Sequence, residues 1–392
     1  METVPPKLAD KPRYEILDGL RGVAAITVMI FHCFESYRPP GGQQHFNHGY
    51  LAVDFFFVLS GFVVGYAYND RWGKMSVIDF FKRRIVRLHP MVIAGAVLGL
   101  LLLFPGSETF PLVWESPWWK IALCFLMCMF LIPCGPGIDI RGWQDFFPLN
   151  CPSWTLAYEY FANILYALVL RHLPKAVLAV ICLCCAFFTL DLTMGWDVFG
   201  LFPDGPLYTV EGGWYLTSQH VYIGFSRLLY PFFCGLLISR CLGARSSSTN
   251  PSGSPIHLKY GFLWTSLILF AILVMPCIGG RTGLPNGIFV AVAVIFLFPM
   301  LVIAGAGSVV ETRIGAAVCK WLADLSYPLY ITHYTLVYIQ YSFALCHPDV
   351  PLWAHLAVST GVIVASIAVA RFISRVYDVP VRKWLADHWL KK

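Results

Sequence analysis

The chain has 392 residues, of which 58% are hydrophobic and only 13% are charged, and its mean hydropathy is +0.66. About a quarter of the residues of a soluble domain are charged, so this composition excludes a soluble globular protein and predicts an all-α, polytopic membrane protein. The net charge of +6 is modest, and because the cations are interspersed with apolar segments, we expect no nucleic acid partner.

Residues 1–16 are polar and contain no apolar stretch of the kind that a signal peptide needs. We expect them to form a cytoplasmic N-terminal segment that stays in the protein. Eleven apolar segments follow, each a candidate for crossing the ~30 Å hydrocarbon core. They centre on residues 19–36, 50–68, 90–104, 118–134, 154–170, 175–191, 220–240, 261–279, 286–305, 322–345 and 353–376.

Basic clusters between the apolar segments set the expected orientation. They lie at Lys82–Arg87, Arg240–Arg245, Arg313–Lys320 and Arg382–Lys392. By the positive-inside tendency they mark cytoplasmic loops and a cytoplasmic tail over residues 382–392. Two cytoplasmic termini require an even number of crossings, so we predict ten transmembrane helices in one membrane-embedded domain over residues 1–392, without a separate soluble domain. Segments 90–104 and 154–170 are the weakest candidates.

Loop composition and cysteine spacing add two expectations. Residues 193–219 are rich in Gly, Pro and aromatic residues and predict an ordered interfacial cap, whereas Ser246–Ser254 has the composition of a mobile polar loop. Thirteen cysteines are present, many inside apolar segments, and no Cys-x-x-Cys pair is followed by a matching pair. We therefore expect buried apolar cysteines, with neither a disulfide framework nor a metal site.

Arg21 and His32 lie eleven positions apart in the first apolar segment. On a helix this spacing returns to nearly the same face and separates the two groups by roughly 16 Å. Ionisable groups within a membrane are costly to bury and are candidates for function. We expect His32, about halfway through the bilayer, to act as a general base; the alternative is a histidine hydrogen-bonded to a neighbouring helix.

Asp54 lies at the start of the second apolar segment, which a short loop joins to the first. It could orient the His32 imidazole, or it could be a carboxylate that only stabilises the start of its helix. Arg83, Arg84 and Arg87 precede the third segment, and Arg84 and Arg87 would share one helical face. Paired guanidinium groups suit a phosphate-bearing ligand, although the cluster could also anchor the chain to lipid headgroups.

Glu159 lies five residues after Trp154 in an apolar segment, so it must be paired, hydrogen-bonded or protonated. It could position substrate, or it could pair with an arginine such as Arg227 in a purely structural buried ion pair. His333 lies in an aromatic segment, where we expect an interfacial packing role.

The order of the motifs is more specific than any one of them. They are LDGLRG (17–22), VDFFFVLSGF (53–62), RRIVRLHP (83–90), SWTLAYE (153–159), an arginine before PFFCG (231–235), and LSYPLYITH (325–333). This series resembles the acyltransferase-3 family of integral-membrane O-acyltransferases, which modify sugars and lipids such as lipopolysaccharide and exopolysaccharide. The resemblance extends from Leu17 to about Trp384.

The resemblance implies a ten-span fold in which acyl-CoA, usually acetyl-CoA, is the cytoplasmic co-substrate, without a tightly bound cofactor, and a glycan or glycolipid hydroxyl is the acceptor. His32 is similar to the family's catalytic histidine, Arg21 to its essential arginine, and Arg84 and Arg87 to its donor-linked arginine pair. Two departures from the family pattern follow. Some relatives carry a C-terminal esterase-like domain, which we do not expect here, and Tyr158 stands where many relatives have an acidic residue.

The expected mechanism is direct transfer. Arg84 and Arg87 would hold the CoA phosphates, and the pantetheine arm would pass Arg21. His32 would deprotonate the acceptor hydroxyl as it attacks the thioester, and Arg21 or a backbone donor would stabilise the developing oxyanion. Cys33 points about 100° away from His32 on a helix, so no covalent intermediate is expected. The rival interpretation is a transporter or flippase of a lipid-linked or anionic substrate; a lipid-sensing receptor has no feature in its favour. The expected location is a bacterial inner membrane.

Overall fold

The computed structural model describes residues 11–38, 44–243 and 253–390. Within these ranges there is no β-strand, only an isolated bridge between Asp145 and Tyr215. The α-helices are α1 (Glu15–Glu35), α2 (Ala52–Tyr68), α3 (Val77–Leu101), α4 (Pro111–Glu115), α5 (Trp118–Met129), α6 (Ser153–Leu168), α7 (Lys175–Met194), α8 (Ser218–Leu242), α9 (Gly261–Val274), α10 (Leu284–Val292), α11 (Phe298–Gly307), α12 (Arg313–Cys346), α13 (Leu352–Ile373) and α14 (Val379–Trp389). Every predicted apolar segment falls largely on one of these helices or, for residues 286–305, on α10 and α11, which confirms the all-α class.

Seven of these helical stretches in the described ranges are long and apolar enough to cross a membrane. They are α1, Gly49–Tyr68, α3, α7, α8, Leu284–Gly307 and Leu352–Trp389. The apolar helices α5 and α9 have only 12 and 14 residues, α6 has 16, and the 34-residue α12 carries polar side chains in its middle. The polytopic fold is confirmed, whereas the count of ten crossings stays a prediction.

Helix α3 begins earlier than the sequence predicts. The Ser76 hydroxyl accepts a hydrogen bond from the Asp79 backbone N–H at 3.1 Å, and the Asp79 carboxylate accepts one from the Ser76 N–H at 3.2 Å. This capping box starts the helix at Val77 and satisfies two backbone donors. The basic motif therefore lies inside α3, which continues through Pro90, rather than in a loop before a segment over 90–104.

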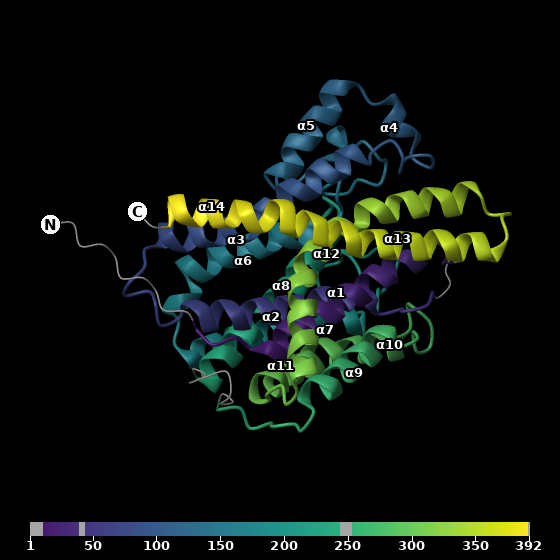
Figure 1. The fold of residues 1–392 in the computed structure, drawn as a ribbon. Coiled ribbons are helices and arrows are strands. Elements are labelled where there is room, and N and C mark those ends of the chain that lie inside the picture. Colours follow the sequence, from purple (N-terminus) through teal and green to yellow (C-terminus); the bar gives the residue numbers. More distant parts are fainter. Residues whose placement is uncertain (1–10, 39–43, 244–252, 391–392) are drawn as a thin grey trace.

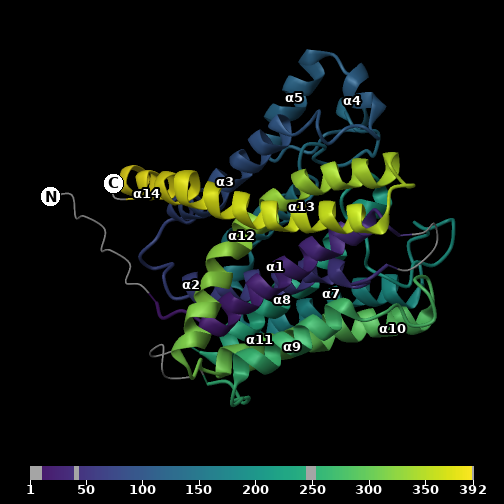
Figure 2. The same cartoon turned by 45° about the vertical axis from the view of Figure 1, so that its right-hand side comes forward.

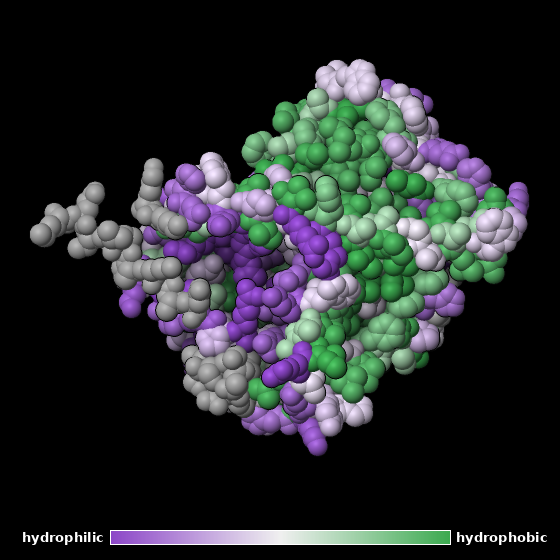
Figure 3. All heavy atoms as spheres, viewed as in Figure 1, coloured by the Kyte–Doolittle hydropathy of each residue, from purple (hydrophilic) through white to green (hydrophobic). Residues whose placement is uncertain are grey.

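The bundle has a polar end and an apolar middle. Figures 1 and 2 show α1, α2 and α8 in the interior, α9 to α11 along one side and α13 and α14 along the other, with α4 and α5 projecting at one edge. The C-terminal end of α14 lies beside the first turns of α3. In Figure 3 hydrophilic residues gather at that end, whereas a hydrophobic surface covers the middle of the molecule. Residues 382–389, predicted as a tail, belong to α14.

Close packing between α2 and α8 depends on two glycines. A Cβ atom on Gly61 would lie 2.0 Å from the Phe232 carbonyl oxygen, and one on Gly235 would lie 2.0 Å from the Val58 carbonyl oxygen. Only glycine lets the two backbones approach this closely, as small residues commonly do between membrane helices.

A buried ion pair joins the same two helices. The Arg227 guanidinium contacts both oxygens of the Asp54 carboxylate, with Nη2 to Oδ2 at 2.7 Å, and the two side chains are 1% and 0% exposed. Arg227 also donates to the carbonyls of Gly212 and Tyr50. The expectation that Asp54 orients His32 is wrong in its geometry, because Asp54 faces α8 and both of its oxygens are engaged by Arg227.

The loop over residues 193–219 is ordered and packed, as expected. The Phe146 N–H donates to the Trp214 carbonyl at 2.8 Å, and a Cβ on Gly213 would touch the Trp154 ring at 2.8 Å. The predicted mobile loop Ser246–Ser254 lies mostly outside the described residues.

We predict that Arg227→Met destabilises the protein by about 3–5 kcal/mol, because it leaves the Asp54 carboxylate buried without its partner. Thermal unfolding of the detergent-solubilised protein measures this. The double variant Asp54→Leu/Arg227→Met should recover much of the loss, since an apolar pair needs no charge compensation. A single variant as stable as wild type would show that the pair is not a structural link.

Candidate functional site

A cavity of about 840 Å³ opens among α1, α2, α3, α6, α12 and the α13–α14 stretch. Its volume is within the ~300–1,000 Å³ range of small-molecule sites. The hydrophilic hollow in Figure 3 lies at this end of the bundle. We call this space the arginine-lined cavity.

Cations dominate the lining of the arginine-lined cavity, with ten basic side chains against four carboxylates. The basic residues are Lys11, Arg13, Arg21, Arg71, Arg83, Arg84, Arg87, Arg371, Arg375 and Arg382, and the acidic residues are Asp18, Glu159, Asp324 and Asp378. Such an excess in a concave, partly apolar site raises the local concentration of anions.

Some of these cations are neutralised by the protein itself. Arg84 Nη2 donates to Glu159 Oε1 at 2.5 Å, and the Ser60 hydroxyl donates to the same oxygen at 3.0 Å. Glu159 was expected to position substrate or to pair with an arginine such as Arg227; the arginine it pairs with is Arg84, because Arg227 contacts Asp54. The ring of Trp154 lies 5.3 Å from the Arg227 guanidinium. The positive charge of Arg84 is therefore largely neutralised by the Glu159 carboxylate.

At the rim of the cavity, Lys11 Nζ contacts Asp70 Oδ1 at 2.6 Å. Partial burial favours the neutral form of Asp70, but the hydrogen bond and charge of Lys11 prevail and hold the pKa of this carboxyl below its ordinary value. Lys11 is thus also a compensated cation.

Four cavity arginines have no hydrogen bond or ion pair with any described residue: Arg83, Arg87, Arg371 and Arg375. Arg371 differs from the other three because its guanidinium lies 5.7 Å from the centre of the Trp321 ring. Arg83 and Arg87 are half-buried on α3, and the Arg83 Nε is buried without an acceptor. Unpaired guanidinium groups facing one cavity would gain most from an anionic ligand with several oxygens. Of the sequence-predicted donor-binding residues, Arg83 and Arg87 are therefore available, and Arg84 is not.

Arg21 and His32 both lie on α1, as predicted, but they face different surroundings. Arg21 lines the arginine-lined cavity, where its Nε donates to the Ser326 hydroxyl at 3.1 Å and its Nη2 lies 3.7 Å from Asp18. His32 lies outside the cavity lining and in the last turn of α1, rather than midway along the helix.

A chain of ring contacts connects the lining of the arginine-lined cavity to His32. Tyr330 lines the cavity, and its hydroxyl lies 3.0 Å from the Thr155 hydroxyl. The Tyr330 ring lies 6.0 Å from the His333 ring, which in turn stacks on His32 at 5.4 Å. The rings of Tyr330 and His333 therefore follow one another from the cavity lining to the histidine.

Glu35 is the acid that contacts His32. His32 Nδ1 lies 2.5 Å from Glu35 Oε2, one helical turn away, and both side chains are about one-fifth exposed. A carboxylate can only accept, so Nδ1 carries a proton, and in the neutral imidazole Nε2 then presents a lone pair. The His32–Glu35 pair therefore has the tautomer that a general base requires.

Sequence reasoning missed Glu35, although an acid three residues after a histidine on a helix was a readable signal. His333, which was expected at an interface, is fully buried. Its Nδ1 donates to the Leu329 carbonyl at 3.0 Å, and its Nε2 is buried without a partner. His333 is thus a neutral neighbour of His32.

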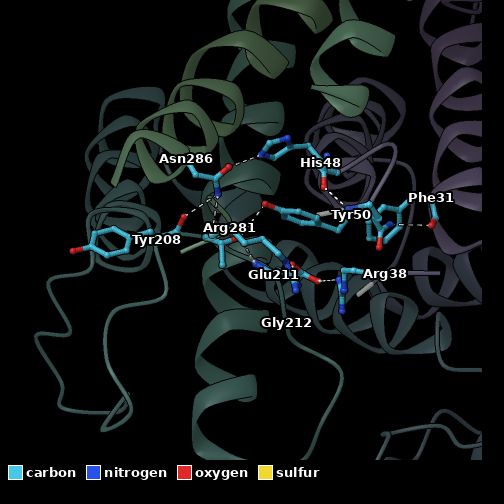
Figure 4. A network of polar contacts seen from close by, with 12 residues as sticks. Phe31, Arg38, His48, Tyr50, Tyr208, Glu211, Gly212, Arg281 and Asn286 are labelled. Atoms are coloured by element: carbon cyan, nitrogen blue, oxygen red, sulfur yellow. Dashed lines mark hydrogen bonds and ion pairs between the residues drawn. The ribbon is translucent and has the colours of Figure 1, made fainter. Parts of the chain in front are cut away.

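A polar network holds the chain that follows His32. In Figure 4 the Glu211 carboxylate lies between two guanidinium groups: it forms an ion pair with Arg281 and lies 3.7 Å from Arg38. His48 bridges the Met275 carbonyl at 2.7 Å and the Asn286 side-chain oxygen at 3.0 Å. These contacts tie the loop after α1 to the segments before α8 and α10.

The chain is similar in sequence to several known proteins. A protein from the picA locus of Rhizobium radiobacter is 31% identical over 40% of the chain and 81% of its own length. A provisionally named O-acetyltransferase of Staphylococcus aureus is 23% identical over 94% of the chain, which spans 57% of that relative. Acyltransferase MdmB of Streptomyces mycarofaciens is 28% identical over 44% of the chain and 42% of its own length. No solved structure matches.

The family model described as an acyltransferase domain matches residues 14–374, which include most of the lining of the arginine-lined cavity and the His32–Glu35 pair. A match of this extent shows the family directly: the chain belongs to the acyltransferase-3 family of membrane acyltransferases.

Proposed function

We propose that this protein transfers an acyl group, with acetyl as the expected group, from acyl-CoA to a hydroxyl group of a glycan or glycolipid. The observation that carries the proposal is the arrangement along α1, with an unpaired arginine cluster around a cavity near one end and a histidine–carboxylate pair at the other. Membership of the acyltransferase-3 family supports the reaction class.

Donor binding follows from the unpaired cations. The phosphates of CoA carry several negative charges, and Arg83, Arg87 and Arg375 offer guanidinium groups without counter-ions. The pantetheine arm would then run along α1 past Arg21. Its thioester would reach His32 only after the rings of Tyr330 and His333, which connect the cavity lining to His32, move aside.

Acyl transfer requires one general base and one nucleophilic attack of the acceptor hydroxyl on the thioester. His32 Nε2 takes the proton of the acceptor hydroxyl while the hydroxyl oxygen forms a bond to the thioester carbonyl carbon. As the carbon–sulfur bond breaks, the same proton can pass to the departing CoA thiolate. Glu35 stabilises the imidazolium that forms between these steps, and no covalent acyl-enzyme is needed.

Orientation and acceptor follow from the same geometry. The arginine-rich end would face the cytoplasm, where acyl-CoA is made, in agreement with the positive-inside tendency. The acceptor would approach His32 from the opposite end, as a glycan or glycolipid destined for the cell surface does. A bacterial inner membrane fits this arrangement.

We predict that His32→Ala abolishes O-acylation without loss of folded protein, since the general base is removed and His32 makes no buried ion pair. Mass spectrometry of total glycans and glycolipids, from cells matched for membrane expression, should show one acyl group missing from a defined species. His347→Ala, at the exposed end of α12, is the control. Full acylation in the His32 variant would overturn the mechanism, and intact acyl-CoA in wild-type membranes would favour a transporter.

We predict that Glu35→Gln lowers kcat roughly 10- to 1,000-fold with a small change in the KM for acyl-CoA, because the variant keeps the shape of the pair and loses its charge. Steady-state kinetics in reconstituted vesicles measure both constants. Asp54→Asn is the comparison and should reduce the yield of folded protein instead. Unchanged kcat for the Glu35 variant would exclude it as the partner of the base.

We predict that Arg87→Ala raises the KM for acyl-CoA roughly 10- to 100-fold, because a charge-assisted contact to phosphate contributes about 1.5–3 kcal/mol. Wild-type KM should also rise with ionic strength, and this rise should be smaller in the variant. Arg313→Ala, at the exposed start of α12 and outside the cavity, is the matched control. Equal KM values in both variants would place the donor elsewhere.

A further inference from the structure

Three cysteine thiols meet where α5 packs against the segment that follows it. Cys124, Cys128 and Cys134 are 0%, 2% and 1% exposed, and their sulfur atoms all lie within 4.8 Å of one another. No other group of three histidine, cysteine or acidic side chains comes this close in the part of the chain that the structure describes. We call these residues the thiol cluster.

The three thiols come together through the fold of the chain, and the spacing of the cysteines in the sequence does not reveal the cluster. Cys124 and Cys128 are one turn apart on the buried face of α5. The chain then reverses at Leu131, whose φ of 54° is unusual for a residue with a side chain. The Cys134 N–H donates to the Phe146 carbonyl at 2.7 Å, which fixes the third thiol over the other two.

The spacing of the sulfur atoms fits metal coordination. Cys124 Sγ and Cys134 Sγ are 3.9 Å apart. Three sulfur ligands placed at about 2.3 Å around one ion would be roughly 4 Å from one another. A disulfide would need a separation of about 2.05 Å, so these thiols are not bonded. The cluster therefore matches a trigonal site of three sulfur ligands, and the sulfur atoms would have to move little to bind one ion.

We propose that the thiol cluster binds one soft, closed-shell metal cation, with Cu⁺ as the best match. Thiolate ligands select Cu⁺ and Zn²⁺ over hard cations. Structural zinc takes four ligands, and the group contains only three, whereas Cu⁺ accepts three. The sequence expectation of no metal site considered only Cys-x-x-Cys pairs, which this arrangement does not use.

A buried cation offsets part of the thiolate charge. Arg141 is 3% exposed and has no ion pair with a described carboxylate, since its Nε donates to the Pro148 carbonyl at 2.6 Å and its Nη1 to the Gly106 carbonyl at 3.3 Å. Its guanidinium interacts electrostatically with Tyr338 and with the Asp145 carboxylate, and to a smaller extent with Cys124. Metal at the cluster would fasten the segment that carries Arg141 to α5, a structural role apart from acyl transfer.

The test measures metal content rather than activity. Wild type, Cys124→Ser and Cys134→Ser are purified under reducing conditions, loaded with Cu⁺ or with Zn²⁺, desalted and analysed by inductively coupled plasma mass spectrometry. Cys185→Ser, a buried cysteine on α7 outside the cluster, is the matched control. We expect one bound ion per chain in wild type and in the control, and at least a fivefold loss in both cluster variants.

A second measurement needs no variant. Metal-free wild type is titrated with Cd²⁺, and the sulfur-to-metal charge-transfer absorbance should saturate at one equivalent with the intensity of three thiolates. Preferential retention of copper over zinc supports three-coordination. Absence of bound metal and of the absorbance, equal loading of cluster variants and wild type, or a Cys124–Cys134 disulfide in peptides of the isolated protein would each overturn the proposal.

Discussion

The packing of α1 against α12 is the contact on which the site depends. Gly22 lies so close to α12 that a Cβ atom would be 2.5 Å from the Leu322 carbonyl oxygen. Farther along the same two helices, the His32 ring stacks on His333. Because one rigid helix carries both Arg21 and His32, the distance from the arginine-lined cavity to the base is set by the helical rise, roughly 16 Å for eleven residues. The separation between the cavity at Arg21 and the base at His32 is therefore fixed by α1.

The arginines that stabilise the fold are different from the arginines that are available to bind a ligand. The Arg227–Asp54 pair is fully buried and compensated, and it joins α2 to α8. Arg84 is likewise matched by Glu159, on the wall of the cavity. The guanidinium groups without a carboxylate partner face the cavity, and Arg87 is the clearest case. A half-buried guanidinium without a partner is energetically unfavourable, so binding an anion there stabilises it most.

Local patterns in the sequence predicted the helices and the placement of Arg21 and His32 on one helix, because hydropathy and helical period are properties of the chain itself. They did not predict which acid meets which base. Asp54 was expected to reach His32 but contacts Arg227, because helix rotation is set by packing, here by the glycine contacts between α2 and α8. With Arg227 engaged in this way, Glu159 pairs with Arg84. The start of α3 was missed for a smaller reason: its capping box lies outside the apolar run.

The most direct test of the account is a structure of the protein with a non-hydrolysable acyl-CoA analogue bound in lipid nanodiscs. The account predicts that the phosphates contact Arg87 and its unpaired neighbours, that Tyr330 has moved, and that the carbonyl carbon lies within reach of a hydroxyl hydrogen-bonded to His32 Nε2. An analogue bound outside the arginine-lined cavity, or one whose acyl group stays on the cavity side of an unmoved Tyr330, would contradict it.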